Sequence, residues 1–217
     1  RVLHRTSDPG RWAAANAGVE ATTSTFIAIH DDDDTWAPSF LARTVDYLEA
    51  HAEPMVATRT EVVHESLDDG FPVLGRQLLA PERSNVQLGE LLTRNWLPPI
   101  SLLYRRSLHT TVGAFDATLP SLGDWDFTLR VLQRFPIALL DGDPLAYWHL
   151  REGVTGPEGN VSLEQSSNPV EARVRDSHWR GAGAADLGSL LLVFGRLDTL
   201  DRAAQARHTH LDHRDRG

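Results

Sequence analysis

The chain has 217 residues, of which 41% are hydrophobic and 24% are charged, so its length and composition suit one folded domain with a small appendage. Its 30 acidic and 21 basic residues give a formal net charge of -9, which disfavours nucleic acid as a partner. The sequence contains no cysteine, which excludes disulfides and thiolate metal sites and fits a reducing compartment. No apolar stretch approaches the ~20 residues that a membrane-spanning helix needs.

The first part of the chain predicts helices and strands in alternation. Alanines at 13–15 favour a helix, and Leu41, Val45 and Leu48 recur at helical spacing. In chain order the patterns predict a short strand at 2–3, a helix over 11–20, a strand at 26–29, a helix over 38–51 and a β-branched strand over 54–64.

The second part continues the alternation after a predicted long surface excursion at 65–85, where the turn signals DDG, GFP and APERSN cluster. Trp125, Leu129 and Leu132 have helical spacing and are expected to face the core. The remaining expectations are a helix over 86–94, a strand over 99–104, a helix from Asp124, strands over 137–140 and 145–149, a loop over 152–168, and an interrupted helix over 169–200.

Four consecutive aspartates, at 31–34, follow the predicted strand at 26–29. Ligands of open α/β sheets bind at this end of a strand, and four adjacent carboxylates repel one another unless a cation or hydrogen-bond donors neutralise them. Oxygen ligands alone suit a hard ion such as Mg²⁺ or Mn²⁺. The alternative is a solvated acidic turn in which Asp34 or Thr35 serves as a helix N-cap.

The second group of carboxylates, Asp124 and Asp126, lies at the start of the helix predicted after residue 123. The N-terminal end of a helix dipole stabilises negative charge there, so a capping role is one interpretation and a catalytic role is the other.

The order and spacing of several short motifs resemble glycosyltransferase family 2, whose members are inverting enzymes of the GT-A fold. The resemblance covers residues 1 to about 150. It rests on Asn16-x-Gly18, Asp31-Asp32-Asp33-Asp34-x-Trp36-x-Pro38, Arg105-Arg106-Ser107, Gly113-x-Phe115-Asp116 and Gly123-Asp124-Trp125-Asp126-Phe127-x-Leu129-Arg130.

The resemblance implies an α/β fold with a GT-A-like (Rossmann-like) mixed sheet flanked by helices and a helical C-terminal extension. The expected divisions are a core at 1–165, a helical extension at 166–200 and a flexible tail at 201–217. Family members begin with strands that build much of the nucleoside pocket, and nothing before Arg1 supplies them, so the core is expected to be incomplete. Ala15 stands where a basic residue often precedes the asparagine.

By the same resemblance, the segment Asp31-Asp32-Asp33 is the motif that holds a divalent ion and the nucleotide-sugar. Asp31 is expected near the ribose and the metal, Asp32 in the donor site, and Asp33 as a ligand of Mn²⁺ or Mg²⁺. Asp34 and Trp36 are expected to be structural, as a cap and in packing.

Asp124 falls on the position of the family's general base, and Gly123 replaces the glutamate that usually precedes it. Asp126 is the second candidate for the base. The other site residues that the resemblance implies are Asn16, Gly18, Trp125, Asp126 and Arg151 for the substrates, and His149 as a further metal ligand.

The expected partners are a nucleotide-sugar donor and a glycan or lipid-linked acceptor, with no nucleic acid. Peripheral membrane association and oligomerisation remain open, and the expected location is the cytoplasm or the inner face of the membrane. Two other functions are considered: a transferase-like module that has lost activity and serves binding or assembly, and a metal-dependent phosphohydrolase. Against the phosphohydrolase, the chain lacks the second set of aspartate, lysine and threonine that such an enzyme is expected to have in a fixed order.

Overall fold

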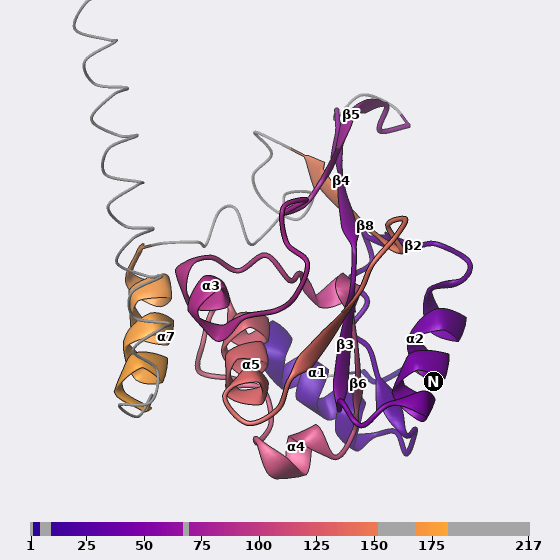
Figure 1. Ribbon diagram of the computed structural model, residues 1–217. Coiled ribbons are helices and arrows are strands. Elements are labelled where there is room, and N and C mark those ends of the chain that lie inside the picture. Colours follow the sequence, from indigo (N-terminus) through magenta and orange to yellow (C-terminus); the bar gives the residue numbers. More distant parts are fainter. Residues whose placement is uncertain (1, 5–9, 67–69, 152–167, 182–217) are drawn as a thin grey trace, which may run out of the picture.

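Two four-stranded sheets form the framework of the protein (Figure 1). The computed structural model describes residues 2–4, 10–66, 70–151 and 168–181. The first sheet has the spatial order β1 (Phe26–Ile27), β6 (Leu102–Arg105), β3 (Met55–Thr58) and β7 (Ile137–Leu140). The second has the order β2 (Thr35–Trp36), β8 (Ala146–Arg151), β4 (Thr60–Glu65) and β5 (Val73–Leu78). Both sheets are mixed, because β3 runs parallel to β7 and β4 runs parallel to β8 while the other pairs are antiparallel.

The single strand predicted at 54–64 is in fact two strands, β3 and β4, that belong to different sheets. The break falls at Arg59, whose carbonyl accepts the N–H of Leu145 at 3.1 Å and whose guanidinium forms an ion pair with Asp141 at 2.9 Å. One continuous segment therefore joins the two sheets.

Helices cover both faces of the first sheet (Figure 1). Side chains alternate along β3, so Met55 and Ala57 join the large core while Val56 packs with Leu48 on the opposite face. The helices are α1 (Arg11–Glu20), α2 (Phe40–Ala50), α3 (Leu88–Thr93), α4 (Leu108–Thr111), α5 (Gly123–Leu132) and α7 (Asn168–Gly181), with a 3₁₀ turn η1 (Pro99–Ser101) before β6. α2 covers the face of Val56, and α1, α3 and α5 lie on the other.

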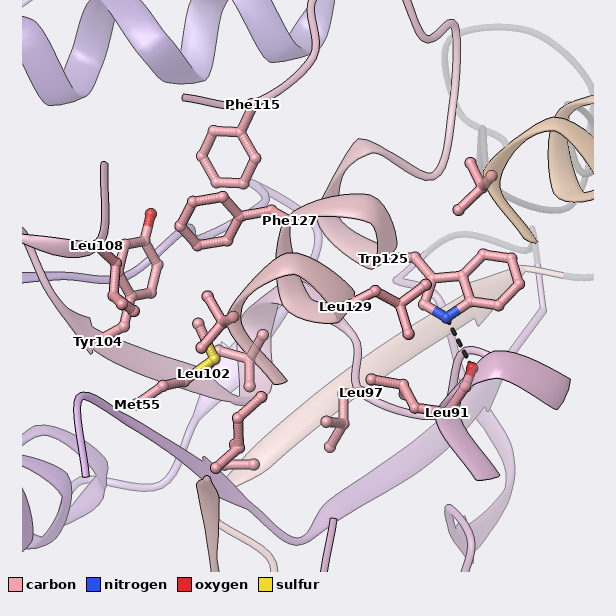
Figure 2. Close-up of a cluster of buried hydrophobic side chains, with 14 of the residues drawn as sticks. Met55, Leu91, Leu97, Leu102, Tyr104, Leu108, Phe115, Trp125, Phe127 and Leu129 are labelled. Carbon is pink, nitrogen blue, oxygen red and sulfur yellow. Dashed lines mark hydrogen bonds between the residues drawn. The ribbon is translucent and has the colours of Figure 1, made fainter. Parts of the chain in front are cut away.

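The large core is built around α5, as the helical spacing predicted (Figure 2). Figure 2 shows Trp125, Phe127 and Leu129 turned inward, with the indole N–H of Trp125 donating to the carbonyl oxygen of Leu91 at 2.8 Å. Trp125 is only 1% exposed, so its assignment as a substrate contact is corrected to a role in packing. Burial of such a ring contributes about 1.5–3 kcal/mol or more to stability.

Several of the observed strands or segments differ from the sequence expectations in presence or length. Residues 2–4 form no strand and are exposed, because no neighbouring strand pairs with them among the described residues. The excursion predicted at 65–85 contains β5, which pairs with β4 although its side chains are mostly exposed. β1 is shorter than predicted, and β2, which was not predicted, follows the aspartates and pairs with β8.

α7 belongs to the helical extension expected at 166–200 and packs beside α5 (Figure 1). The guanidinium of Arg175 lies 5.4 Å from the ring centroid of Trp125, and the side chain of Gln133 donates to the carbonyl of His178 at 3.4 Å. The tail at 201–217 and most of the expected loop at 152–168 lie outside the described residues. Within the described part of the chain, no helix is long and apolar enough to cross a bilayer.

Gly123, the first residue of α5, lies against the ring of Trp12. A Cβ at this position would come within 2.7 Å of three ring atoms, and Trp12 is only 2% exposed. We expect Gly123→Ala to lower the free energy of unfolding by about 1–3 kcal/mol, because neither element can move without disturbing the core. Urea denaturation measures the change.

Gly18→Ala is the matched control, because Gly18 also lies in a helix and its added Cβ would meet nothing within 4 Å. Its stability should be unchanged or higher by up to about 1 kcal/mol. Equal urea midpoints for the two variants would show that Trp12 does not constrain Gly123.

Candidate active site

The four aspartates form a turn between β1 and β2. The Asp34 N–H donates to the carbonyl of Asp31 at 3.3 Å, and the Asp34 carboxylate accepts the N–H of His149 at 3.0 Å. Asp32 is exposed, whereas Asp34 is only 5% exposed. The helix N-cap proposed for Asp34 or Thr35 is wrong, because α2 begins after Ser39. Asp34 instead ties this turn, hereafter the acidic turn (residues 31–34), to β8.

A cavity of about 70 Å³ joins the acidic turn to the start of α5. Asp31, Asp34 and Asp124 all line it, although 90 residues or more separate Asp124 from the two other aspartates in sequence. Among the described residues it is Asp34, not Asp33, that joins Asp31 in this cavity. The other residues that line the cavity are Arg11, Leu79, Asn95, Pro98, Pro99, Ser121, Leu122 and Trp148.

Asp124 is held at the helix start by a side chain from the α3–η1 connection. The amide of Asn95 donates to Asp124 Oδ2 at 3.1 Å. Burial raises the pKa of Asp124, while the charge of Arg11 and the bond from Asn95 oppose that rise. A carboxylate with a raised pKa binds a proton more readily near neutral pH, which suits a general base.

Arg11 is a site residue that the sequence analysis missed. Its Nη2 donates to Asp31 Oδ2 at 2.8 Å, and its charge lowers the pKa of both Asp34 and Asp124 against the effect of burial. The only signal in the sequence was a basic residue at the start of the helix that carries Asn16-x-Gly18, which says nothing about distance to the aspartates.

His149 is positioned by bonds to both of its ring nitrogens. Nδ1 lies 2.7 Å from Glu65 Oε1, and Nε2 lies 2.9 Å from Thr35 Oγ1. Arg151 pairs with the same glutamate, its Nε 3.4 Å from Glu65 Oε2. His149 therefore links β8 to the residue after the acidic turn, and as a metal ligand it would have to exchange one of these partners. Glu65 and Thr35 were not expected at the site.

The acidic turn has the donor chemistry of a hard-cation site. The pKa of Asp33 is raised, chiefly by burial and further by the charges of Asp31 and Asp32, with Arg151 opposing. A cation would relieve this repulsion, and carboxylate oxygens are the ligands that Mg²⁺ and Mn²⁺ prefer. In the part of the chain that the structure describes, no three side chains of His, Cys, Asp or Glu are gathered as a ready metal site. Further ligands would therefore come from a substrate or from water.

Two of the expected substrate contacts have structural partners instead. The Asn16 side chain donates to the carbonyl of Phe115 at 2.9 Å and accepts its N–H at 3.0 Å, so Asn16 ties α1 to that loop. Asp126 pairs with Arg130 at 2.8 Å and with His178 at 2.9 Å. Burial alone would raise the pKa of Asp126, but the bonds from His178 and Arg130 outweigh it and lower the pKa. The structure thus places Asp126 in an internal ion pair, outside the cavity of Asp124.

A second, larger hollow lies between α1 and β1 and is hereafter called the α1–β1 trough. Its volume is about 540 Å³, and Gly18 forms part of its wall. Apolar residues from β1 and its extension, including Phe26 and Ile29, line the opposite side. The trough and the cavity of Asp124 meet at Arg11 and Asp31, which line both.

The buried carboxyl of Asp34 predicts a pH-dependent stability. Burial raises its pKa to about 7, compared with about 3.9 in an unfolded chain. Because the folded state holds this proton more tightly, the contribution of Asp34 to stability is complete below pH ~4 and is lost as pH rises through about 7. We expect Asp34→Asn to gain about 2–4 kcal/mol in free energy of unfolding relative to the wild type over that range.

Urea titrations of both proteins in EDTA, at intervals from pH 4 to pH 8, measure this difference. The asparagine oxygen can still accept the N–H of His149, so the backbone tie remains in the variant. If the two stability curves ran parallel across the range, Asp34 would not be protonated in the folded protein.

Comparison with known proteins adds to this geometry. The sequence model of glycosyl transferase family 2 matches residues 1–110. The pre-mycofactocin glycosyltransferase of Mycobacterium tuberculosis is 30% identical, over 88% of this chain and 45% of that protein. The uncharacterised glycosyltransferase YwdF of Bacillus subtilis is 29% identical over 63% of this chain and 49% of that protein. The chain thus spans about half the length of the curated relatives it matches.

Solved structures support the fold. The first 349 residues of S. aureus TarS, crystallised with UDP-GlcNAc, superpose with a TM-score of 0.59 over 88% of this chain and 52% of that one, at 17% identity. This likeness confirms the expected GT-A-like mixed sheet flanked by helices. Because the family model matches just over half of the 217 residues, the chain belongs to glycosyl transferase family 2.

Proposed function

We propose that the chain carries the catalytic part of an inverting, metal-assisted glycosyltransferase. It would move a sugar from a nucleotide-sugar donor to a hydroxyl group on a glycan or lipid-linked acceptor. The observation that carries the proposal is the shared cavity of about 70 Å³, which Asp31 and Asp34 of the acidic turn line together with Asp124. The TarS structures with UDP-GlcNAc and with UDP support a nucleotide-sugar as the donor class.

Asp124 is the proposed general base. An inverting transfer needs a group that takes the proton of the acceptor hydroxyl while its oxygen attacks the anomeric carbon from the face opposite the leaving diphosphate. Asp124 fits this role because it lines the cavity, its pKa is raised by burial, and Asn95 holds one of its oxygens. Asp126 is a poorer candidate because Arg130 and His178 occupy its carboxylate.

The acidic turn is the proposed donor-side element. Asp31 and Asp33 would hold Mn²⁺ or Mg²⁺, and His149 would keep the turn in register with β8 through Thr35. The bound ion would supply positive charge beside the leaving nucleoside diphosphate. The chain's own contribution is to hold several carboxylates close together, a repulsive arrangement that divalent-cation binding stabilises.

Asp124→Asn should abolish sugar transfer while leaving the donor dissociation constant nearly unchanged, because a base acts on the acceptor. Loss of a general base costs about 10²–10⁴ in rate. The measurement is release of nucleoside diphosphate from a panel of nucleotide-sugars with candidate acceptors, beside donor affinity by calorimetry.

Asp46→Asn removes an exposed carboxylate from α2, outside the cavity, and should behave as wild type. Unchanged turnover in Asp124→Asn would remove Asp124 from the mechanism. If the wild-type chain bound nucleotide-sugars but transferred nothing to any acceptor, a binding or assembly role would be favoured.

Binding of a nucleoside diphosphate should require a divalent ion, and Asp33→Asn should weaken it about tenfold or more, because one charged ligand is lost. Calorimetry in Mn²⁺, in Mg²⁺ and in EDTA measures this directly. Equal affinity in EDTA and in Mn²⁺ would exclude the metal role of the acidic turn.

A further inference from the structure

Arg11 stands where two hollows of the protein meet. Of the described residues, only Arg11 and Asp31 line both the α1–β1 trough and the cavity of Asp124. A ligand that extends from the trough to Asp124 must therefore pass this ion pair.

The guanidinium of Arg11 is held in place, but most of its N–H donors have no hydrogen-bond partner among the described residues. It lies 4.8 Å from the ring centroid of Trp12, which is itself buried, so the side chain rests on a rigid platform. Of the five N–H donors that an arginine carries, one is engaged by a described residue, Asp31, at 2.8 Å, and the side chain is 32% exposed. The remaining donors are available to a ligand in either hollow.

The positive charge of Arg11 is outnumbered by the carboxylates around it. It acts on Asp31, Asp34 and Asp124 together, so one cation serves three carboxylates. A divalent ion at the acidic turn would compete with Arg11 for Asp31, and a phosphate group that arrived with the ion would give the guanidinium a new anionic partner. Arginine suits that partner because its planar fork can bind two phosphate oxygens at once.

We propose that Arg11 is a donor-binding residue that contacts the diphosphate of the nucleotide-sugar at the junction of the α1–β1 trough and the cavity of Asp124. This inference rests on the proposed function and names a further residue of its donor site. Asp31 is the partner of Arg11 in the ligand-free protein, and the diphosphate replaces it when the donor and the metal bind.

The competing explanation is that Arg11 only neutralises Asp31. The two roles predict opposite signs when the charge is removed. If Arg11 is only a counterion, its loss frees Asp31 and tightens the binding of both Mn²⁺ and the nucleotide. If Arg11 binds the diphosphate, its loss weakens nucleotide binding while Mn²⁺ alone binds as before or more tightly.

The test uses the whole chain and three variants: Arg11→Gln, Arg11→Lys and, as a control, Arg43→Gln, which removes the same charge from the exposed surface of α2. Titration calorimetry measures the dissociation constant of Mn²⁺ alone, and then those of UDP, GDP, ADP and dTDP at saturating Mn²⁺. We expect the nucleotide that binds the wild type best to bind Arg11→Gln about tenfold or more weakly, with Mn²⁺ affinity equal or higher and Arg43→Gln unchanged.

Arg11→Lys keeps the charge but loses the fork, so nucleotide binding should again weaken, whereas a pure counterion role predicts no change. Thermal unfolding monitored by circular dichroism shows whether Arg11→Gln folds. If it does not, Arg11→Lys alone distinguishes the two roles of Arg11. Nucleotide binding that is unchanged or tighter in both variants, or a loss of Mn²⁺ and nucleotide affinity in equal proportion, would overturn the proposal. If the wild type bound no nucleoside diphosphate, the proposed function itself would fall, and this inference with it.

Discussion

The contact between the Trp12 ring and the backbone of Gly123 sets the geometry on which the site depends. It is a contact that only glycine permits, since a Cβ would lie 2.7 Å from the ring. Each of the two residues has a charged site residue as its neighbour in sequence: Arg11 comes before Trp12, and Asp124 comes after Gly123. One packing interaction therefore places a cation and a carboxylate on the same cavity. It also accounts for the glycine at position 123, because Trp12 fills the space that a side chain would need.

The electrostatics of the site follow from this placement. Burial raises the pKa of Asp33, Asp34 and Asp124, and the opposing charges of Arg11 and Arg151 offset it only in part. Under the proposed function, a divalent cation and the diphosphate bound to it would relieve the repulsion among these carboxylates. Burial also raises the pKa of Asp124, as the proposed general base would require.

The sequence predicted the parts of this structure that have a local cause. The alanines at 13–15 located α1, and helical spacing located α2 and the start of α5, all within two residues. The apolar run before the aspartates located the acidic turn after β1. Parts that depend on distant contacts could not be predicted. The passage of one segment from the first sheet to the second depends on a bond from Leu145, and the burial of Asp34 depends on β8. The position of Arg11 depends on its contact with the ring of Trp12. Family motifs were also ambiguous, because Asn16, Arg106 and Arg130 proved to bind backbone carbonyls within the fold.

The central claim is that the acidic turn and Asp124 serve one ligand from two sides of one cavity. The most direct test is a crystal structure of the chain with Mn²⁺ and a nucleoside diphosphate, with anomalous diffraction data collected at the manganese edge to locate the metal. We expect one strong anomalous peak in contact with the carboxylate of Asp33 or Asp31, with the diphosphate beside it and Asp124 on the side of its terminal phosphate. A manganese peak bound elsewhere, or a nucleotide separated from Asp124 by the sheet, would contradict it.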